Sequence, residues 1–230
     1  MKIEVLPDAD AVAQRAAEFI ADAAAEAVAL RGVFAFAMSG GRTPWQMLAL
    51  LGTLPMPWER THLFQVDERV APPGDPDRNL THMTESLLTR VTVAPGNVHA
   101  MPVEAPDLVA GATHYADELK TFAGMPPTLD LVHLGLGPDG HTASLLPDDP
   151  VLRVTSTSVA LTAPYQGHRR MTLTYPVLDR ARCVMWVVTG AEKVAMLARL
   201  VDGDRTIPAG CVNGERAVIL ADAAAAALLR

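Results

Sequence analysis

A glycine-rich stretch near the middle of the sequence combines a backbone turn with an acid and a base. Residues 134–147 read LGLGPDGHTASLLP and follow LDLVHL, an apolar run typical of a buried strand. Asp139 and His141 flank Gly140 on this turn. Imidazole is the side chain whose ordinary pKa suits proton transfer near neutral pH, and a nearby carboxylate could orient it. We interpret His141 as a candidate general base and Asp139 as its partner, although a lone histidine is usually structural.

The same stretch contains the pattern G-x-G-x-x-G, at Gly135, Gly137 and Gly140, which also occurs in dinucleotide-binding turns. In that role the turn opens a long helix, and an acidic residue follows about 20 positions later. Here Pro147 interrupts the helix, and residues 155–163 contain no Asp or Glu. The pattern therefore fails as a nicotinamide-binding fingerprint, which weakens the interpretation of the chain as a dehydrogenase.

A second glycine-rich turn, SGGRTP, begins at Ser39 after the apolar run VFAFAM. Gly40 and Gly41 let the backbone turn sharply and approach a ligand closely. The lysine and hydroxyl residue of a nucleoside-triphosphate loop do not follow them. The turn is therefore either a site for a phosphate or carboxylate, or only a tight connection between a strand and a helix.

The residues after this turn predict how the next helix begins. We expect Thr43 to be its N-cap, Pro44 its first residue and Gln46 the return partner of a capping box. The free N–H groups and the positive dipole end of that helix would face the glycine turn, which favours anion binding there.

Charged residues at other strand ends could complete such a site. Asp67 and Arg69 directly follow the strand pattern THLFQV, where charges are costly unless they face solvent or a ligand. Arg69 offers a planar, permanently charged set of donors to an anionic or carbonyl oxygen. Arg170, with Arg169 beside it, and Lys193 also adjoin predicted strands. Each of these charges alone is typical of a solvated surface or turn, but together with the glycine turn they could clamp a phosphate.

The elements that must position these residues alternate between helix and strand. Apolar periodicity predicts helices over residues 8–30, 79–90, 108–122 and 192–200, another from Pro44, and a terminal one in the alanine-rich tail 221–230. Strands are expected at residues 33–38, 61–66, 129–134, 158–163, 171–175, 183–188 and 217–220, and a loop at 71–78. We therefore expect an α/β fold in one domain, residues 1–230. Its sheet should be mostly parallel and Rossmann-like, with helices on both faces. Such sheets bind ligands outside the carboxyl ends of their strands.

Composition excludes several classes of partner. The 230 residues are 50% hydrophobic, carry a formal net charge of -7 and contain no Lys/Arg-rich run, so we expect no nucleic-acid binding. No apolar run of about 18 residues and no signal-peptide pattern occur, which favours a cytoplasmic protein without a membrane partner. Cys183 and Cys211 lack metal-site spacing, and a reduced protein without structural zinc is the simpler interpretation.

Taken in order along the chain, the strand ends resemble the 6-phosphogluconolactonase family, within a superfamily that includes the glucosamine-6-phosphate deaminases. The matching segments are SGGRTP, DERVAPPGDPDRN, LGLGPDGHTASLLP, RRMTLTYPVLDRAR and VVTGAEK. The resemblance implies the glucosamine-6-phosphate deaminase/ribose-5-phosphate isomerase-like fold. It also implies hydrolysis of 6-phosphogluconolactone to 6-phosphogluconate, in the oxidative pentose phosphate pathway, by a cytoplasmic enzyme without metal or organic cofactor. Its partner would be a sugar phosphate, and both a monomer and a homodimer fit the sequence.

The resemblance also implies roles for matching positions. His141 would be the general base that activates water, and Asp139 would hold it in place. Arg69 would stabilise the negative oxygen that develops during attack, and Asp67 would lie near the ring hydroxyls. Gly40, Gly41 and the helix start at Thr43 would receive the phosphate, aided by Arg170 and Lys193. Ser39 is the remaining substrate-binding residue.

Two further functions remain as alternatives. The resembling deaminases use a glutamate, paired with histidine, at the position of Leu146, and a leucine cannot accept a proton. A non-catalytic sugar-phosphate-binding module would keep the anion site and need no base, so Asp139 and His141 count against it.

Overall fold

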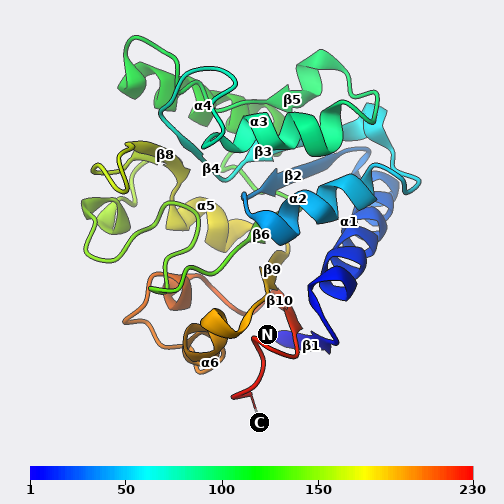
Figure 1. The fold of residues 1–230 in the computed structure, drawn as a ribbon. Coiled ribbons are helices and arrows are strands. Elements are labelled where there is room, and N and C mark those ends of the chain that lie inside the picture. The colour runs from blue at the N-terminus through cyan, green and yellow to red at the C-terminus, as the bar shows by residue number, and fades with distance from the viewer. Residues whose placement is uncertain (230) are drawn as a thin grey trace.

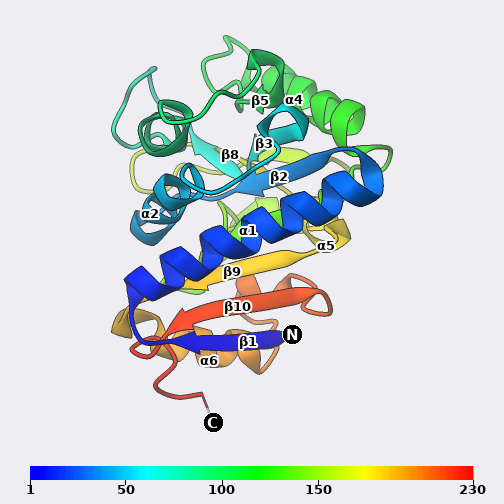
Figure 2. The ribbon, with the colours of Figure 1, turned by 90° about the vertical axis from the view of Figure 1, so that its right-hand side faces the viewer.

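A seven-stranded sheet forms the centre of the molecule, which a computed structural model describes over residues 1–229. In spatial order the strands are β1 (Lys2–Leu6), β10 (Ala217–Asp222), β9 (Val184–Val188), β6 (Leu131–Leu134), β2 (Phe34–Met38), β3 (Thr61–Gln65) and β5 (Val98–His99). Every pair of neighbouring strands in the sheet runs parallel, and Figure 2 shows the arrows of β1, β10, β9 and β2 pointing the same way. The central strands are buried along their whole length, because helices cover both faces. The expected parallel α/β architecture is confirmed.

Alternate residues of the sheet point into two separate apolar layers. Phe34 and Phe36 of β2 pack with α1 (Ala9–Arg31) and α2 (Arg42–Leu51) on one face. Ala35 and Ala37 face the other layer, which contains α4 (Leu108–Ala123), α5 (Tyr175–Arg180) and α6 (Val194–Val201). Figure 1 shows α1 and α2 on one side of the strands and α5 and α6 on the other. Within residues 1–229 none of the helices is both long and apolar enough to cross a membrane.

The first helix begins and ends where the sequence predicts. The Asp8 carboxylate accepts a hydrogen bond from the Ala11 N–H at 2.9 Å, which caps the first turn. Gly32, at φ 80°, ends the helix in the left-handed conformation that glycine adopts without strain. Small side chains such as Ala16 and Ala24 form its buried face, which lets α1 lie close to the sheet.

A second, smaller sheet of three antiparallel strands lies beside the carboxyl end of β3. Its order is β4 (Asp67–Arg69), β8 (Arg170–Leu173) and β7 (Val159–Leu161). The strands expected at residues 158–163 and 171–175 are present as β7 and β8, and they pair in this antiparallel sheet. The chain leaves the parallel sheet at Val66, whose N–H donates to Met38 O (3.0 Å) and whose carbonyl accepts from Leu173 N (2.8 Å). Asp67 and Arg69 therefore belong to a strand and not to a turn.

The rest of the chain differs from expectation in several places. Over residues 221–229 the alanine-rich tail is not a helix: β10 runs to Asp222, and hydrogen-bonded turns follow over residues 223–228. The Asp222 carboxylate accepts from Ala225 N at 2.7 Å and so fixes the first of these turns. The helix expected over 79–90 is an α-helical turn, α3 (Asn79–Met83), continued by a π-helical turn to Leu88. Strands β1 and β5 and helix α5 were not predicted.

Candidate active site

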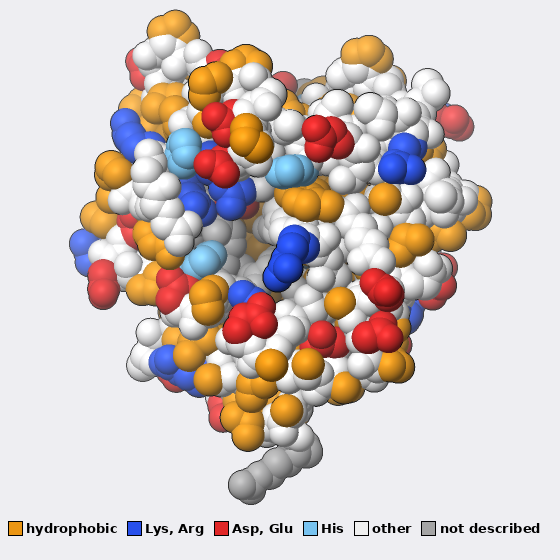
Figure 3. Space-filling model, in the orientation of Figure 1, with side chains coloured by type: hydrophobic (Ala, Val, Ile, Leu, Met, Phe, Trp, Pro, Cys, Tyr) orange, Lys and Arg blue, Asp and Glu red, His pale blue; other side chains and the backbone are white. Residues whose placement is uncertain are grey.

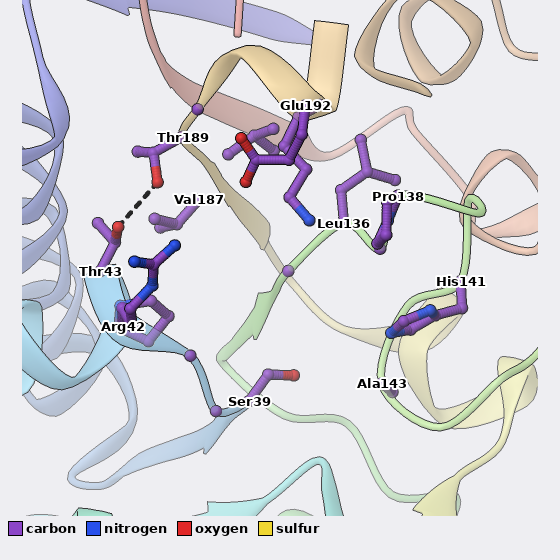
Figure 4. A pocket seen from close by; sticks show the side chains of 18 of the residues that line it. Ser39, Arg42, Thr43, Leu136, Pro138, His141, Ala143, Val187, Thr189 and Glu192 are labelled. Carbon is purple, nitrogen blue, oxygen red and sulfur yellow. Dashed lines mark hydrogen bonds between the residues drawn. The ribbon is translucent and has the colours of Figure 1, made fainter. Parts of the chain in front are cut away.

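A cleft of about 560 Å³ lies at the carboxyl ends of the parallel strands. Figure 3 shows it as a hollow in the surface around which Lys and Arg side chains gather, and Figure 4 shows its lining from close by. The cleft brings together residues from all the strand ends that the sequence singled out. Nine of the predicted site residues line it: Ser39, Gly40, Gly41, Thr43, Asp67, Arg69, His141, Arg170 and Lys193. The tenth, Asp139, contacts the cleft through His141.

His141 and Asp139 form a hydrogen-bonded pair at the end of β6. The His141 Nδ1 lies 2.6 Å from Asp139 Oδ1, and the His141 backbone N–H donates to the same oxygen at 3.1 Å. The Tyr165 hydroxyl donates to the other carboxylate oxygen at 3.4 Å. Because Asp139 engages Nδ1, Nε2 is the ring nitrogen available to a ligand. Figure 4 shows the imidazole extending from its loop into the cleft.

The electrostatics of this pair favour a carboxylate beside the imidazole. Partial burial acts to raise the pKa of Asp139. The hydrogen bonds from the His141 backbone and ring, and the attraction of an imidazolium, outweigh that effect, so the pKa lies below its usual range. Asp139 is therefore ionised near neutral pH and accepts hydrogen bonds from His141 as a carboxylate.

Two glycines of this loop, Gly137 and Gly140, lie where a side chain would not fit. A Cβ at Gly137 would overlap His141 Nδ1 and stand 2.7 Å from Asp139 Oδ1. Gly140 has φ +83°, and a Cβ there would lie 2.7 Å from Ile207 Cβ. A short 3-10 turn, Pro150–Arg153, follows the loop in place of the long helix that a dinucleotide-binding turn opens. Gly137 therefore makes room for the histidine pair and Gly140 for a left-handed turn against Ile207, and the G-x-G-x-x-G pattern does not open a dinucleotide-binding helix.

The expected capping of α2 is wrong, although its N-terminus does face the cleft. The helix begins at Arg42 with Gly41 as N-cap at φ 142°, and no side chain among residues 1–229 caps it. The Thr43 hydroxyl hydrogen-bonds Thr189 Oγ1 at 2.8 Å (Figure 4). Gln46 donates to Asp10 Oδ1 of α1 at 2.8 Å and forms no capping box. The first N–H groups of α2 thus stay available to an anion.

The cations of the cleft stand at two places. Arg42, which sequence reasoning missed although it lies within SGGRTP, and Lys193, just before α6, line it beside the glycine turn. Arg69 and Arg170 are direct neighbours across β4 and β8. Arg170 lines the cleft, whereas Arg169 is exposed at the surface.

Arg170 is a buried cation without a complete set of partners. Its side chain is 5% exposed, its guanidinium lies 5.2 Å from the centre of the Tyr165 ring, and its Nε has no hydrogen-bond partner among residues 1–229. Burial and the neighbouring positive charge of Arg69 lower the pKa of Arg170, while Asp67 opposes that shift. Two like charges held together at low exposure favour an anion between or beside them.

Asp67, the first residue of β4, is hydrogen-bonded to the loop that carries His141. Its Oδ2 accepts from Ser144 Oγ at 2.7 Å, and Ser144 lies three residues after His141. The Asn79 amide donates to Asp67 Oδ1 at 3.4 Å and to the Asp67 carbonyl at 2.9 Å. Ser144 and Asn79 were both missed, because nothing local in the sequence marks them as partners of Asp67.

Neither metal nor disulfide is part of the described site. Within residues 1–229 no group of three or more His, Cys, Asp or Glu side chains is arranged to hold a metal ion. Cys183 and Cys211 are free thiols.

The fold and this cleft define the class of protein. Residues 7–220 match the model of the family described as glucosamine-6-phosphate isomerases/6-phosphogluconolactonase, and the chain belongs to this family.

Particular relatives narrow the comparison. The chain is 36% identical over 203 residues to the 6-phosphogluconolactonase of Synechocystis sp., which covers 86% of this chain and 84% of the relative. The crystal structure of the 6-phosphogluconolactonase of Thermotoga maritima superposes with a TM-score of 0.86 at 27% identity, over 96% of this chain and 98% of that one. A monomeric glucosamine-6-phosphate deaminase has a TM-score of 0.87 at 17% identity, over 99% of this chain and 100% of its own, and shares the fold.

Proposed function

We propose that this protein hydrolyses 6-phosphogluconolactone to 6-phosphogluconate. The observation that carries the proposal is the His141–Asp139 pair, whose free ring nitrogen lines a cleft that also holds four cationic side chains. Such a cleft suits an anionic substrate that is attacked by water. The names of the relatives, including the one from Synechocystis, supply the identity of the lactone.

The reaction needs one general acid–base residue near the lactone carbonyl. His141 Nε2 takes a proton from water as the water oxygen bonds to the lactone carbonyl carbon. The electron pair of the carbonyl moves onto its oxygen, and the Arg69 guanidinium stabilises that negative charge. As the carbonyl reforms, the bond to the ring oxygen breaks, and the imidazolium returns its proton to that oxygen. Asp139 stabilises the imidazolium between these steps.

The phosphate end is assigned to the turn at the end of β2. The uncapped N-terminus of α2, beyond Gly40 and Gly41, offers N–H groups and a positive dipole end. Lys193 and Arg170 line the same cleft and add positive charge, and the Arg170 Nε–H makes no hydrogen bond within residues 1–229. Asp67 is left to accept hydrogen bonds from sugar hydroxyls.

A deaminase–isomerase on the same fold would need a further proton acceptor after the histidine. Leu146, which stands at that position, is 3% exposed and packs as an apolar side chain. Ring opening and isomerisation need more acid–base groups than a single water attack. The lactonase is therefore the better proposal.

The test compares lactone hydrolysis by the wild type and His141→Ala. The lactone is generated in situ from glucose 6-phosphate, and its uncatalysed opening is the baseline. We expect fast hydrolysis by the wild type and a loss of about 10²-fold or more in the variant. His114→Ala, at an exposed position of α4, is the matched control and should keep wild-type activity. A wild type no faster than the baseline would reject the proposal, and glucosamine 6-phosphate would then be the next substrate to assay.

A further inference from the structure

Asn79, the first residue of α3, lies between the residues that line two sides of the cleft. Its side chain is 3% exposed. Its Oδ1 accepts a hydrogen bond from the Arg69 guanidinium, and its Nδ2 donates to the Asp67 carbonyl at 2.9 Å. One buried amide thus contacts Asp67 and Arg69, the first and last residues of β4.

Asn79 also packs against the glycine turn at the end of β2. A Cβ at Gly40 would overlap Asn79 Oδ1 and stand 2.8 Å from its Cγ. Because Gly40 has no side chain, the Asn79 amide fits against the backbone of the turn. The amide is confined from this side as well as by its hydrogen bonds.

The buried carboxylate of Glu68 fixes the backbone of Asn79. Glu68 is 0% exposed. It accepts four hydrogen bonds at 2.8 Å each, from Gln65 Nε2 and from the backbone N–H groups of Arg69, Asn79 and Leu80. The Asn79 and Leu80 N–H groups belong to the first turn of α3. The Glu68 carboxylate of β4 therefore caps this helix, whose own N-cap residue makes no side-chain cap. Strand β4 and the start of α3 are held as one unit.

The charges around Arg69 explain why a neutral acceptor matters. Arg170 lies directly opposite Arg69 across the two strands, and the two like charges repel. Without a partner, the Arg69 guanidinium would turn away toward solvent. A carboxylate would hold it but would also neutralise it, whereas an amide oxygen holds it and leaves its charge for a ligand.

We propose that Asn79 is a positioning residue that aims the Arg69 guanidinium into the cleft. The inference rests on the proposed function for its kinetic consequence, because Arg69 acts there on the developing oxyanion. Misplacing such a donor costs rate while the phosphate end of the cleft still binds. Asn79→Ala should therefore lower kcat by about 10- to 100-fold and change KM by less than about threefold.

A double-mutant cycle separates positioning from a general structural role. Asn79→Ala, Arg69→Ala and the double variant are compared by kcat. If Asn79 acts through Arg69, its replacement in the Arg69→Ala background changes kcat by less than about twofold. Effects that multiply independently would overturn the inference, as would a wild-type kcat in Asn79→Ala. Asn97→Ala, which removes an amide that donates to Glu59 O at 3.4 Å, is the control and should leave kcat unchanged.

Asn79→Asp covers the case in which the alanine variant does not fold. It preserves the shape of the side chain and the acceptor for Arg69, but it replaces the donor to the Asp67 carbonyl by an oxygen and adds a charge. We expect a folded protein with kcat lowered by about tenfold or more, because the new carboxylate neutralises Arg69. Wild-type kcat in this variant would contradict the inference.

An NMR measurement on the protein without substrate tests the positioning role of Asn79 separately from the proposed function. In protein carrying ¹⁵N-arginine, the Arg69 guanidinium, assigned with Arg69→Lys, should show slow rotation in the wild type and fast rotation in Asn79→Ala. Unchanged Arg69 signals would overturn the positioning role even in an active enzyme. An inactive wild type with a restrained Arg69 would reject the lactonase and retain the positioning role.

Discussion

Acid should destabilise this protein through His99, a buried histidine of β5. The side chain is 3% exposed, and its ring lies 4.2 Å from that of Phe64, measured between centroids. Its Nε2 lies 2.9 Å from His62 Nδ1, and its Nδ1 lies 3.8 Å from Glu118 Oε1 of α4. Burial, and then the charge of His62, lower the pKa of His99 from 6.5 to about 4.

The sign and size of the effect follow from that shift. Above pH 6.5 the imidazole is neutral in the folded and the unfolded chain. As the pH falls from 6.5 toward about 4, the unfolded chain binds a proton that the folded chain does not, so folding stability is lost over this window. At about pH 5 the loss from His99 amounts to about 2 kcal/mol, and it approaches about 3 kcal/mol at lower pH.

Urea unfolding at about pH 8 and about pH 5 measures this loss. His99→Gln removes the titration and keeps a hydrogen-bonding group beside His62, so it should lose about 2 kcal/mol less than the wild type between the two conditions. Other buried groups, such as His133, whose pKa burial lowers to about 3, contribute equally to both proteins and cancel in the difference. His114→Gln, at an exposed position, is the control. An equal loss in wild type and His99→Gln would refute the reasoning.

Three further predictions concern the cleft. Asp139→Asn should lower kcat by about 10²-fold, because an amide cannot stabilise the imidazolium; an unchanged kcat would show that His141 works alone. Arg170→Ala should raise the KM for the lactone by about tenfold or more, whereas Arg169→Ala should leave it unchanged. Steady-state kinetics on both variants test this, and a raised KM in Arg169→Ala alone would show that Arg169 binds the phosphate instead. Gly140→Ala should destabilise the fold by about 1–2 kcal/mol from its positive φ, and by more from the contact with Ile207, as measured by urea unfolding; wild-type stability would contradict the strain.

Sequence patterns predicted the parallel sheet because its strands are marked locally. The run from Val33 to Met38 is apolar without alternation and ends at two glycines, which is what burial on both faces requires. Strand β1 escaped notice because it is an edge strand whose sequence, KIEVL, includes exposed and charged residues. The alanine-rich tail favours a helix by intrinsic propensity, but pairing of β10 with β9 extends the strand through Ala221. Tertiary pairing decided the outcome there.

In the site, too, some residues could be predicted from the sequence and others could not. The residues predicted to line the cleft follow strands, and the carboxyl ends of parallel strands meet at one edge, so their convergence could be foreseen. Their partners could not. Thr43 looks like a helix cap, but its hydroxyl bonds Thr189, which lies 146 positions away in the chain. Asn79 sits at the end of a proline-rich loop, and only the fold brings it to Arg69.

The double anchoring of Val66 has a consequence for the kinetics of ligand capture. Its N–H is bonded to the parallel sheet and its carbonyl to the antiparallel one, so the two sheets cannot swing apart without breaking a backbone hydrogen bond. The glycine turn after β2 and the charged residues of β4 stand on opposite sides of that joint. The spacing between these two sides of the cleft is therefore held fixed by the backbone when a ligand enters. Association is expected to be a single bimolecular step, with an observed rate that rises linearly with ligand concentration and no slow closing phase.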